Sequence, residues 1–310
     1  MCFQKKNMKR KLCLLAIIPA MMFSVGCKEK NMKKEVNVII LSGQSNAAGC
    51  KNSQYLIQTM GQEKYDQYEA GFEDVKIAFS NWTVDYTKPE RTKIFQNGSL
   101  KGKFVNVKLG QGNVTTNFGP EIGIAEELHE RWGNKLYIIK VPCGASNIAY
   151  DWSLPTDEMF VTLVKFVKNR MKDLEDEGYQ PYLRAFCWMQ GEGDSYDGYY
   201  QYYFDNLVSL KHNLDTELLK YTENESGLPF IDAGIGRGTH ADGTDEWRFY
   251  KEVNEAKQKF AALSDIHIYF DTIEAGLHSN QEPNDDVHYD SESQIKLGHL
   301  FAQNFEQFLK

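Results

Sequence analysis

The chain has 310 residues, and 42% of them are hydrophobic, so it can bury the core of one large or two ordinary domains. It carries 35 basic and 43 acidic residues, a formal net charge of −8 at pH 7. This acidic balance argues against nucleic acid and anionic membrane surfaces as partners.

The N-terminus has the pattern of a secretory signal peptide over residues 1–26, with five basic residues and then a short apolar stretch up to Val25. A membrane-spanning helix is the alternative, but the stretch is shorter than the ~20 residues that a bilayer requires, and Pro19 interrupts it. The small residues before Cys27 resemble a bacterial lipobox. We therefore expect Cys27 to carry a lipid anchor and residues 27–35 to form a tether.

This leader predicts where the protein works. We expect it to be secreted and lipid-anchored to the bacterial envelope, in the periplasm or at the cell surface, with the anchor as its only membrane contact. Removal of residues 1–26 leaves 30 basic against 43 acidic residues, a net charge of −13.

Six apolar runs rich in β-branched residues, with amphipathic patterns between them, predict an α/β fold over residues 36–310. Such continuous runs are typical of strands buried on both faces of a parallel sheet. The alternation predicts a three-layer α/β/α sandwich with a mostly parallel, flavodoxin-like sheet. The predicted strands are 36–41, 75–79, 136–141, 183–188, 230–235 and 266–270. The predicted helices are 121–131, 159–174, 199–219, 246–263 and a last one opening with a capping-box pattern at 291–294.

Between about residues 50 and 117 the pattern loosens into polar, Gly-, Asn- and Lys-rich sequence with scattered aromatics. Long segments of this kind in a compact domain are usually functional loops. We expect a loop-rich insertion that forms the wall of a substrate cleft.

The tetrapeptide Gly43-Gln44-Ser45-Asn46 directly follows the first predicted strand, where open α/β sheets place their ligands. A serine hydroxyl is a weak nucleophile, so Ser45 would need a general base and a group that orients the base. His288 and Asp285 can supply both. Asp285 can accept the Nδ1 proton of His288, which leaves Nε2 free to face Ser45.

The oxyanion that develops in acyl transfer needs hydrogen-bond donors placed in advance. Three candidates are the backbone N–H groups of Ser45 and Gly144 and the side-chain amide of Gln190. Each lies just beyond a predicted strand, so all three can converge on one edge of the sheet. The candidate substrate-binding residues are Asn46, Asn147 and Glu192.

These motifs resemble the SGNH-type carbohydrate esterases, specifically the sialic-acid-specific acetylesterase (SASA) and acetylxylan-esterase-like family. The matching segments span the chain from about Val38 to the C-terminus. They are Gly43–Asn46, Gly119–Glu121, the segment at Gly144, Gln190–Asp194, Asp285–Tyr289, Gln294 and Gly298.

The resemblance implies hydrolysis of O-acetyl groups on sugars without a metal or other cofactor. It assigns Ser45 as nucleophile, His288 as base, Asp285 as orienting acid, and Gly144 and Gln190 as oxyanion donors. Two positions depart from the family pattern, and we expect them to alter the pocket rather than the chemistry. Ala47 stands where the family often has Met, and Ala145 interrupts the usual Gly-Gly-Thr/Ser.

Competing assignments stay open for several residues. Asp286, Glu192 or Asp194 could replace Asp285 as the acid, and the latter two could instead cap a helix or hold a loop. His278 is the rival base. Cys143 is more typical of a small packed residue than of a nucleophile, and His240 either lines the cleft or decorates a loop. The tyrosines between 196 and 203 either stack on sugar rings or bury in a helix.

The sequence thus predicts a serine acetylesterase whose substrate is an acetylated oligosaccharide or sialic acid. An esterase for other small esters and a non-catalytic glycan-binding surface lipoprotein are the alternatives. The cysteines show no CxxC or Cys/His ligand spacing, so neither a zinc site nor a disulfide framework is indicated. The sequence gives neither the acetylated position nor the oligomeric state.

Overall fold

The computed structural model describes residues 1–2, 33–196, 198–240, 242–279, 285 and 287–310. The predicted signal peptide and its Cys27 anchor lie outside the described residues, and so does Asp286. Residues Lys33–Lys310 form one compact unit. None of the helices in the described ranges is long and apolar enough to cross a membrane.

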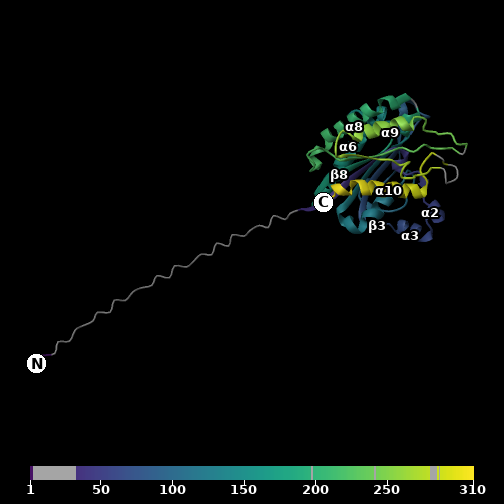
Figure 1. Ribbon diagram of the computed structural model, residues 1–310. Helices are drawn as coiled ribbons and strands as arrows, with labels where there is room; N and C mark the ends of the chain where they lie inside the picture. The colour runs from purple at the N-terminus through teal and green to yellow at the C-terminus, as the bar shows by residue number, and fades with distance from the viewer. Residues whose placement is uncertain (3–32, 197, 241, 280–284, 286) are drawn as a thin grey trace. The chain divides into compact units, whose positions relative to one another are not determined.

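A mostly parallel sheet runs through this unit (Figure 1). Its parallel strands, in spatial order, are β10 (His267–Phe270), β9 (Phe230–Ala233), β8 (Tyr179–Met189), β1 (Lys34–Gly43), β7 (Leu136–Gly144) and β3 (Phe72–Asp85). The strands β4 (Thr92–Gly98) and β5 (Val105–Val107) pair antiparallel with β3. A separate small sheet joins β2 (Lys51–Asn52) to β6 (Asn117–Phe118). All six predicted strands are present.

Helices cover both faces of the sheet, which confirms the three-layer sandwich (Figure 1). One layer contains α4 (Glu121–Trp132) and α10 (Ser291–Phe305), and the other contains α6 (Glu158–Asp176), α8 (Tyr203–Leu218) and α9 (Tyr250–Ala261). The shorter helices are α1 (Ser45–Ala48), α2 (Tyr55–Thr59), α3 (Gln62–Ala70), α5 (Ile148–Asp151) and α7 (Glu192–Tyr196), with a 3₁₀ turn η4 at Gly198–Tyr202.

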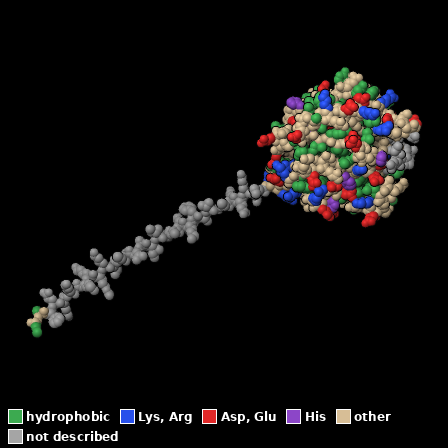
Figure 2. Space-filling model, viewed as in Figure 1, with side chains coloured by type: hydrophobic (Ala, Val, Ile, Leu, Met, Phe, Trp, Pro, Cys, Tyr) green, Lys and Arg blue, Asp and Glu red, His purple; other side chains and the backbone are tan. Residues whose placement is uncertain are grey.

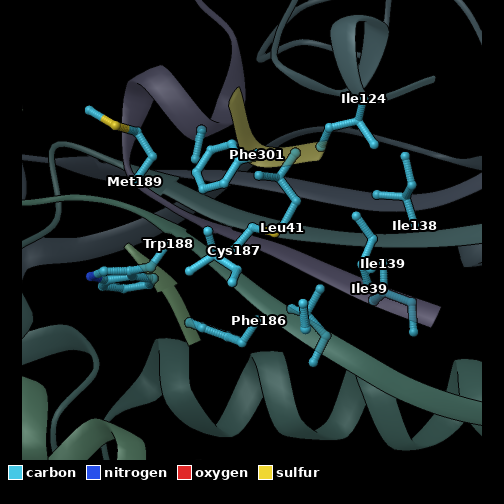
Figure 3. Close-up of a cluster of buried hydrophobic side chains, with 14 of the residues drawn as sticks. Ile39, Leu41, Ile124, Ile138, Ile139, Phe186, Cys187, Trp188, Met189 and Phe301 are labelled. Atoms are coloured by element: carbon cyan, nitrogen blue, oxygen red, sulfur yellow. The ribbon is translucent and has the colours of Figure 1, made fainter. Parts of the chain in front are cut away.

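The central strands are buried on both faces, as their continuous apolar sequences predict. Figure 3 shows Ile124 of α4 and Phe301 of α10 packing on one face, with Phe186 and Trp188 of β8 directed to the other. Charged side chains of both signs are interspersed on the face seen in Figure 2.

Helices α4 and α10 approach each other at two glycines. A Cβ on Gly123 would lie 2.0 Å from the carbonyl oxygen of Ile295, and one on Gly298 would lie 2.2 Å from that of Pro120. The N-cap of α10 is Asp290, whose side chain accepts the N–H of Ser293 at 2.8 Å. The capping box predicted from Ser291 is therefore wrong by one residue, because an aspartate before it takes the capping position.

The segment from 50 to 117 is more ordered than its polar composition predicts. It contributes β3 to the main sheet and forms α2, α3 and the small β2–β6 sheet. Polar side chains hold its irregular parts, since Asn81 and Asn97 each donate to the carbonyl of Gly112. The polar residues that suggested a loop thus satisfy the backbone of a fixed structure.

Candidate active site

A cavity of about 720 Å³ opens where β1 and β7 end. It is lined by Ser45, His288, Gly144 and Asn147, four of the residues that the sequence singles out. These residues come from parts of the chain that the parallel sheet brings to a single edge, as such sheets do with their ligand sites.

Ser45 is the first residue of α1 and directly follows a tight turn. Gly43 has φ +136°, and a Cβ there would lie 1.9 Å from the carbonyl oxygen of Met189, so only glycine fits. The next residue, Gln44, donates its N–H to the same carbonyl at 2.8 Å. Ser45 therefore lines the cavity, and no described group accepts its backbone N–H.

His288 and Asp285 form the predicted pair. The ring nitrogen Nδ1 of His288 lies 2.9 Å from Oδ2 and 3.1 Å from Oδ1 of the Asp285 carboxylate. Oδ1 also accepts the backbone N–H of His288 at 3.1 Å. This arrangement leaves Nε2 as the ring nitrogen available to the cavity. Ser45 and His288 line the same cavity but do not hydrogen-bond each other. Such bonds often tighten only when substrate binds.

Lys51 is a member of this site that the sequence analysis missed. Its Nζ lies 3.2 Å from Oδ2 of Asp285 and donates to the carbonyl oxygen of Asp285 at 3.1 Å, although the side chain is only 2% exposed. Burial alone would raise the pKa of Asp285, but His288 and Lys51 hold it well below its usual range. The acid is therefore ionised at neutral pH.

The environment of His288 favours its protonated form. Burial alone would lower the pKa of His288, but Cys50 and Asp285 raise it above its ordinary value. Cys50 lies beside the imidazole, and its Sγ lies 3.4 Å from the carbonyl oxygen of Ser45, to which it donates. A protonated His288 cannot accept a proton, so the ring would have to lose this proton before it could act as a base.

Asn46 lies beneath the cavity and joins three parts of the site. Its Nδ2 donates to Glu192 Oε1 at 2.8 Å, and its Oδ1 accepts the N–H of Tyr289 at 3.0 Å and the amide of Gln294 at 3.2 Å. Both Asn46 and Glu192 are buried, and neither lines the cavity. Of the three candidate substrate-binding residues, only Asn147 does.

Gln190 reaches the site but does not present its amide to the cavity. Its Nε2 lies within donor distance of Asp194 Oδ2 at 2.6 Å, Gln44 Oε1 at 3.2 Å and the carbonyl of Ser146 at 3.3 Å. Its Oε1 accepts the hydroxyl of Tyr203 at 3.1 Å. The predicted role as a third oxyanion donor thus does not match this orientation, because the neighbouring carboxylate takes the amide. Burial raises the pKa of Asp194 to about 7.

The competing residues lie elsewhere or are inert. His278 lines a different cavity of about 220 Å³, and His240 pairs with Glu246 at 2.9 Å. Cys143 is fully buried, and burial raises the pKa of its thiol. Within the described ranges, no three His, Cys, Asp or Glu side chains meet as metal ligands.

The tyrosines between 196 and 203 have different surroundings, and Tyr202 is exposed outside the cavity. Tyr196 and Tyr199 line the cavity, whereas Tyr203 is buried beneath it and Tyr200 stacks on Phe249.

Comparison with solved structures supports the fold. A protein from Arabidopsis thaliana superposes with a TM-score of 0.57 at 18% identity, covering 89% of this chain and 100% of its own. NanS superposes with a TM-score of 0.54 at 14% identity, covering 89% of this chain and 98% of its own. A carbohydrate acetylesterase from Xanthomonas citri superposes with a TM-score of 0.53 at 18% identity, covering 88% of this chain and 56% of its own. A search of curated proteins found no significant match.

The amino-acid sequence itself matches the family described as "Carbohydrate esterase, sialic acid-specific acetylesterase" over residues 35–307. This match covers the sheet, its helices and the cavity. The chain therefore belongs to the sialic acid-specific acetylesterase family of carbohydrate esterases, and it is an esterase.

Proposed function

We propose that the protein releases acetate from O-acetylated carbohydrates through an acyl-enzyme formed on Ser45. The observation that carries this proposal is the Asp285–His288 hydrogen bond at the edge of the cavity that Ser45 lines. A nucleophile, a base and a carboxylate that orients the base are the minimum set for this chemistry.

In the first half-reaction, Ser45 Oγ attacks the acetyl carbonyl carbon while His288 Nε2 accepts the hydroxyl proton. Asp285 fixes the ring through Nδ1 and stabilises the imidazolium. His288 then protonates the departing sugar oxygen, which breaks the ester bond and leaves acetyl-Ser45. In the second half-reaction, His288 accepts a proton from water as its oxygen attacks the acyl-enzyme, and returns it to Ser45 as acetate leaves.

The backbone N–H groups of Ser45 and Gly144 are the donors we assign to the oxyanion. Both residues line the cavity. Gln190 instead supports the site from below, through its bonds to Asp194 and Gln44.

The family and the mixture of aromatic and polar side chains that line the cavity support an acetylated sugar as substrate. Sialic acid and xylan-type substrates are the two classes to compare. The experiment measures acetate release from O-acetyl sialic acids and acetylated xylo-oligosaccharides by the purified protein. We expect the wild type to turn over these substrates. Ser45→Ala and His288→Ala should each abolish this turnover. His278→Ala, which changes a histidine outside the cavity, should retain it. Glycan binding without acetate release by the wild type would contradict the proposal.

We further propose that Cys27 anchors the protein to the bacterial envelope. The support is the lipobox-like sequence that precedes it. Labelled palmitate should enter the wild type but not Cys27→Ala, and that variant should leave the membrane fraction. A variant that stays membrane-bound would rule out the anchor.

A further inference from the structure

The cavity extends beyond the catalytic residues to a wall of aromatic side chains. These are Tyr86, Tyr150, Tyr196, Tyr199 and Trp247. Three of them are strongly exposed, with Tyr86 at 63%, Tyr150 at 51% and Tyr196 at 44%. Exposed aromatic side chains that gather around a cavity typically mark a binding surface.

The centre of this wall is a fixed pair. The rings of Tyr150 and Tyr199 meet edge to face, with centroids 5.2 Å apart and planes at 87°. Their hydroxyl oxygens lie 3.4 Å apart. The guanidinium of Arg91 lies over Tyr150 at 5.8 Å and over Tyr86 at 5.3 Å.

Arg91 is itself held in place from below. The fully buried carboxylate of Asp151 accepts Arg91 Nη2 at 2.6 Å and the backbone N–H of Asn147 at 2.8 Å, and its other oxygen lies 2.7 Å from Lys93 Nζ. Arg91 and its neighbour Glu90 have φ of +51° and +59°, which is unusual for residues with a side chain. Such strain persists where the surroundings fix the backbone, and it clusters at ligand-binding sites.

The composition of the wall selects a class of ligand. A pyranose ring offers an apolar C–H face and a polar edge, and this wall offers aromatic surface beside hydrogen-bonding groups. The other lining residues include Gln44, Gln96, Asn113 and Asn147. A long acyl chain would offer these side-chain amides no further hydrogen-bond partner. The cavity volume falls in the range that encloses whole small-molecule ligands, so it exceeds what one acetyl group fills.

We propose that Tyr150, supported by Tyr199 and Arg91, forms a subsite for a second sugar unit, so that the preferred substrate is an acetylated oligosaccharide rather than a single acetylated sugar. This inference rests on the proposed function. Tyr150 contacts the carbohydrate and takes no part in the acyl transfer itself.

The test compares kcat/KM for an acetylated xylo-oligosaccharide, an acetylated monosaccharide and 4-nitrophenyl acetate. In Tyr150→Ala, we expect the ratio of the oligosaccharide value to the 4-nitrophenyl acetate value to fall by about tenfold or more, mainly through KM. Tyr150→Phe keeps the ring and should keep the ratio. Tyr202→Ala, an equally exposed tyrosine outside the cavity, should behave as wild type.

A second measurement separates failure of the subsite from failure of the proposed function. Calorimetric titration of Ser45→Ala with a deacetylated xylo-oligosaccharide should show binding that Tyr150→Ala weakens in the double variant. An unchanged ratio of the oligosaccharide value to the 4-nitrophenyl acetate value, including equal losses on all three substrates, would overturn the subsite. Wild-type turnover of 4-nitrophenyl acetate with none of the acetylated sugars would overturn the proposed function instead.

Discussion

The floor and the wall of the cavity are built in opposite ways. The floor consists of buried polar residues at the ends of β1 and β8, namely Gln44, Asn46, Gln190, Glu192 and Asp194. They hydrogen-bond mainly to one another and to the backbone. The wall consists of the exposed rings of Tyr86, Tyr150 and Tyr196 and the half-buried rings of Tyr199 and Trp247. A buried network tolerates little change, whereas an exposed ring can be replaced without disturbing the core. On the proposed mechanism, the floor holds the catalytic residues in place and the wall selects the substrate.

The largest expected effect on stability comes from the turn that carries Ser45. Gly43→Ala would place a methyl group 1.9 Å from the carbonyl oxygen of Met189, between β1 and β8. We expect a loss of about 4 kcal/mol or more in the free energy of unfolding, because neither strand can move away within the sheet. Urea denaturation measures this loss.

Gly61→Ala is the matched control for that substitution. Gly61 also has positive φ, at +91°, but nothing lies within 4 Å of the added methyl group. It should cost only about 1–3 kcal/mol, from backbone strain alone. Similar losses in the two variants would show that the close contact in the floor is not what fixes the turn.

Lys51→Met tests the charged support around Asp285 and His288. His288 faces the charges of Asp285 and Lys51, and Cys50 and the buried Glu192 lie nearby. Removing the lysine cation favours the protonated imidazole, so the pKa of His288 should rise further. We expect kcat/KM at neutral pH to fall by about tenfold. We also expect the acid limb of its pH profile, already above the ordinary histidine value of about 6.5, to move to higher pH.

The pH profile distinguishes an electrostatic role from a merely structural one. A pH-independent loss of activity would mean that Lys51 only holds the loop of Asp285. Lys51→Arg, which keeps the charge, should restore the position of the limb.

Asp194→Asn tests the floor through the pH dependence of stability. Burial raises the pKa of Asp194 to about 7, so the folded state binds this proton more tightly than the unfolded state, where the pKa is about 3.9. This contribution to stability is complete below about pH 4 and is lost as the pH rises through 7. An asparagine keeps the acceptor for Gln190 and Ile148 and cannot ionise. The free energy of unfolding of the variant should thus fall less between pH 4 and 8 than that of wild type. Equal dependence of this free energy on pH in the two proteins would contradict the raised pKa of Asp194.

The smallest expected effect lies where floor and wall meet, at Ala145. It has φ +57°, in the region that favours glycine, and its carbonyl oxygen accepts the hydroxyl of Tyr86 at 2.6 Å. Ala145→Gly relieves the backbone strain, which should raise the free energy of unfolding. The glycine also adds freedom to the unfolded chain, which limits the rise to about 1 kcal/mol. Thermal unfolding measures the gain, and a lower midpoint would mean that the methyl group packs usefully against the cavity.

Local patterns in the sequence predicted most of the fold and part of the site. The continuous apolar runs gave the six strands, since burial on both faces leaves little choice of residue. Asp285 and His288 are three residues apart, so their pairing could be inferred without knowing the fold.

Features that depend on distant contacts could not be predicted in the same way. Lys51 meets Asp285 across 234 residues, and nothing in its own segment marks it. The orientation of Gln190 depends on Asp194, which sequence analysis treated as a spare acid or cap. The polar stretch from 50 to 117 is typical of a loop-rich insertion because much of its order comes from side-chain bonds to the backbone, which have no periodicity.

The bond from Tyr289 to Asn46 also adds a long-range contact that the folding chain must form. It joins residues 243 positions apart and ties the histidine loop to the nucleophile turn. Closing so long a loop costs entropy that is recovered only when α10 docks on the sheet. We therefore expect recovery of esterase activity to lag behind recovery of helical signal when the denatured protein refolds.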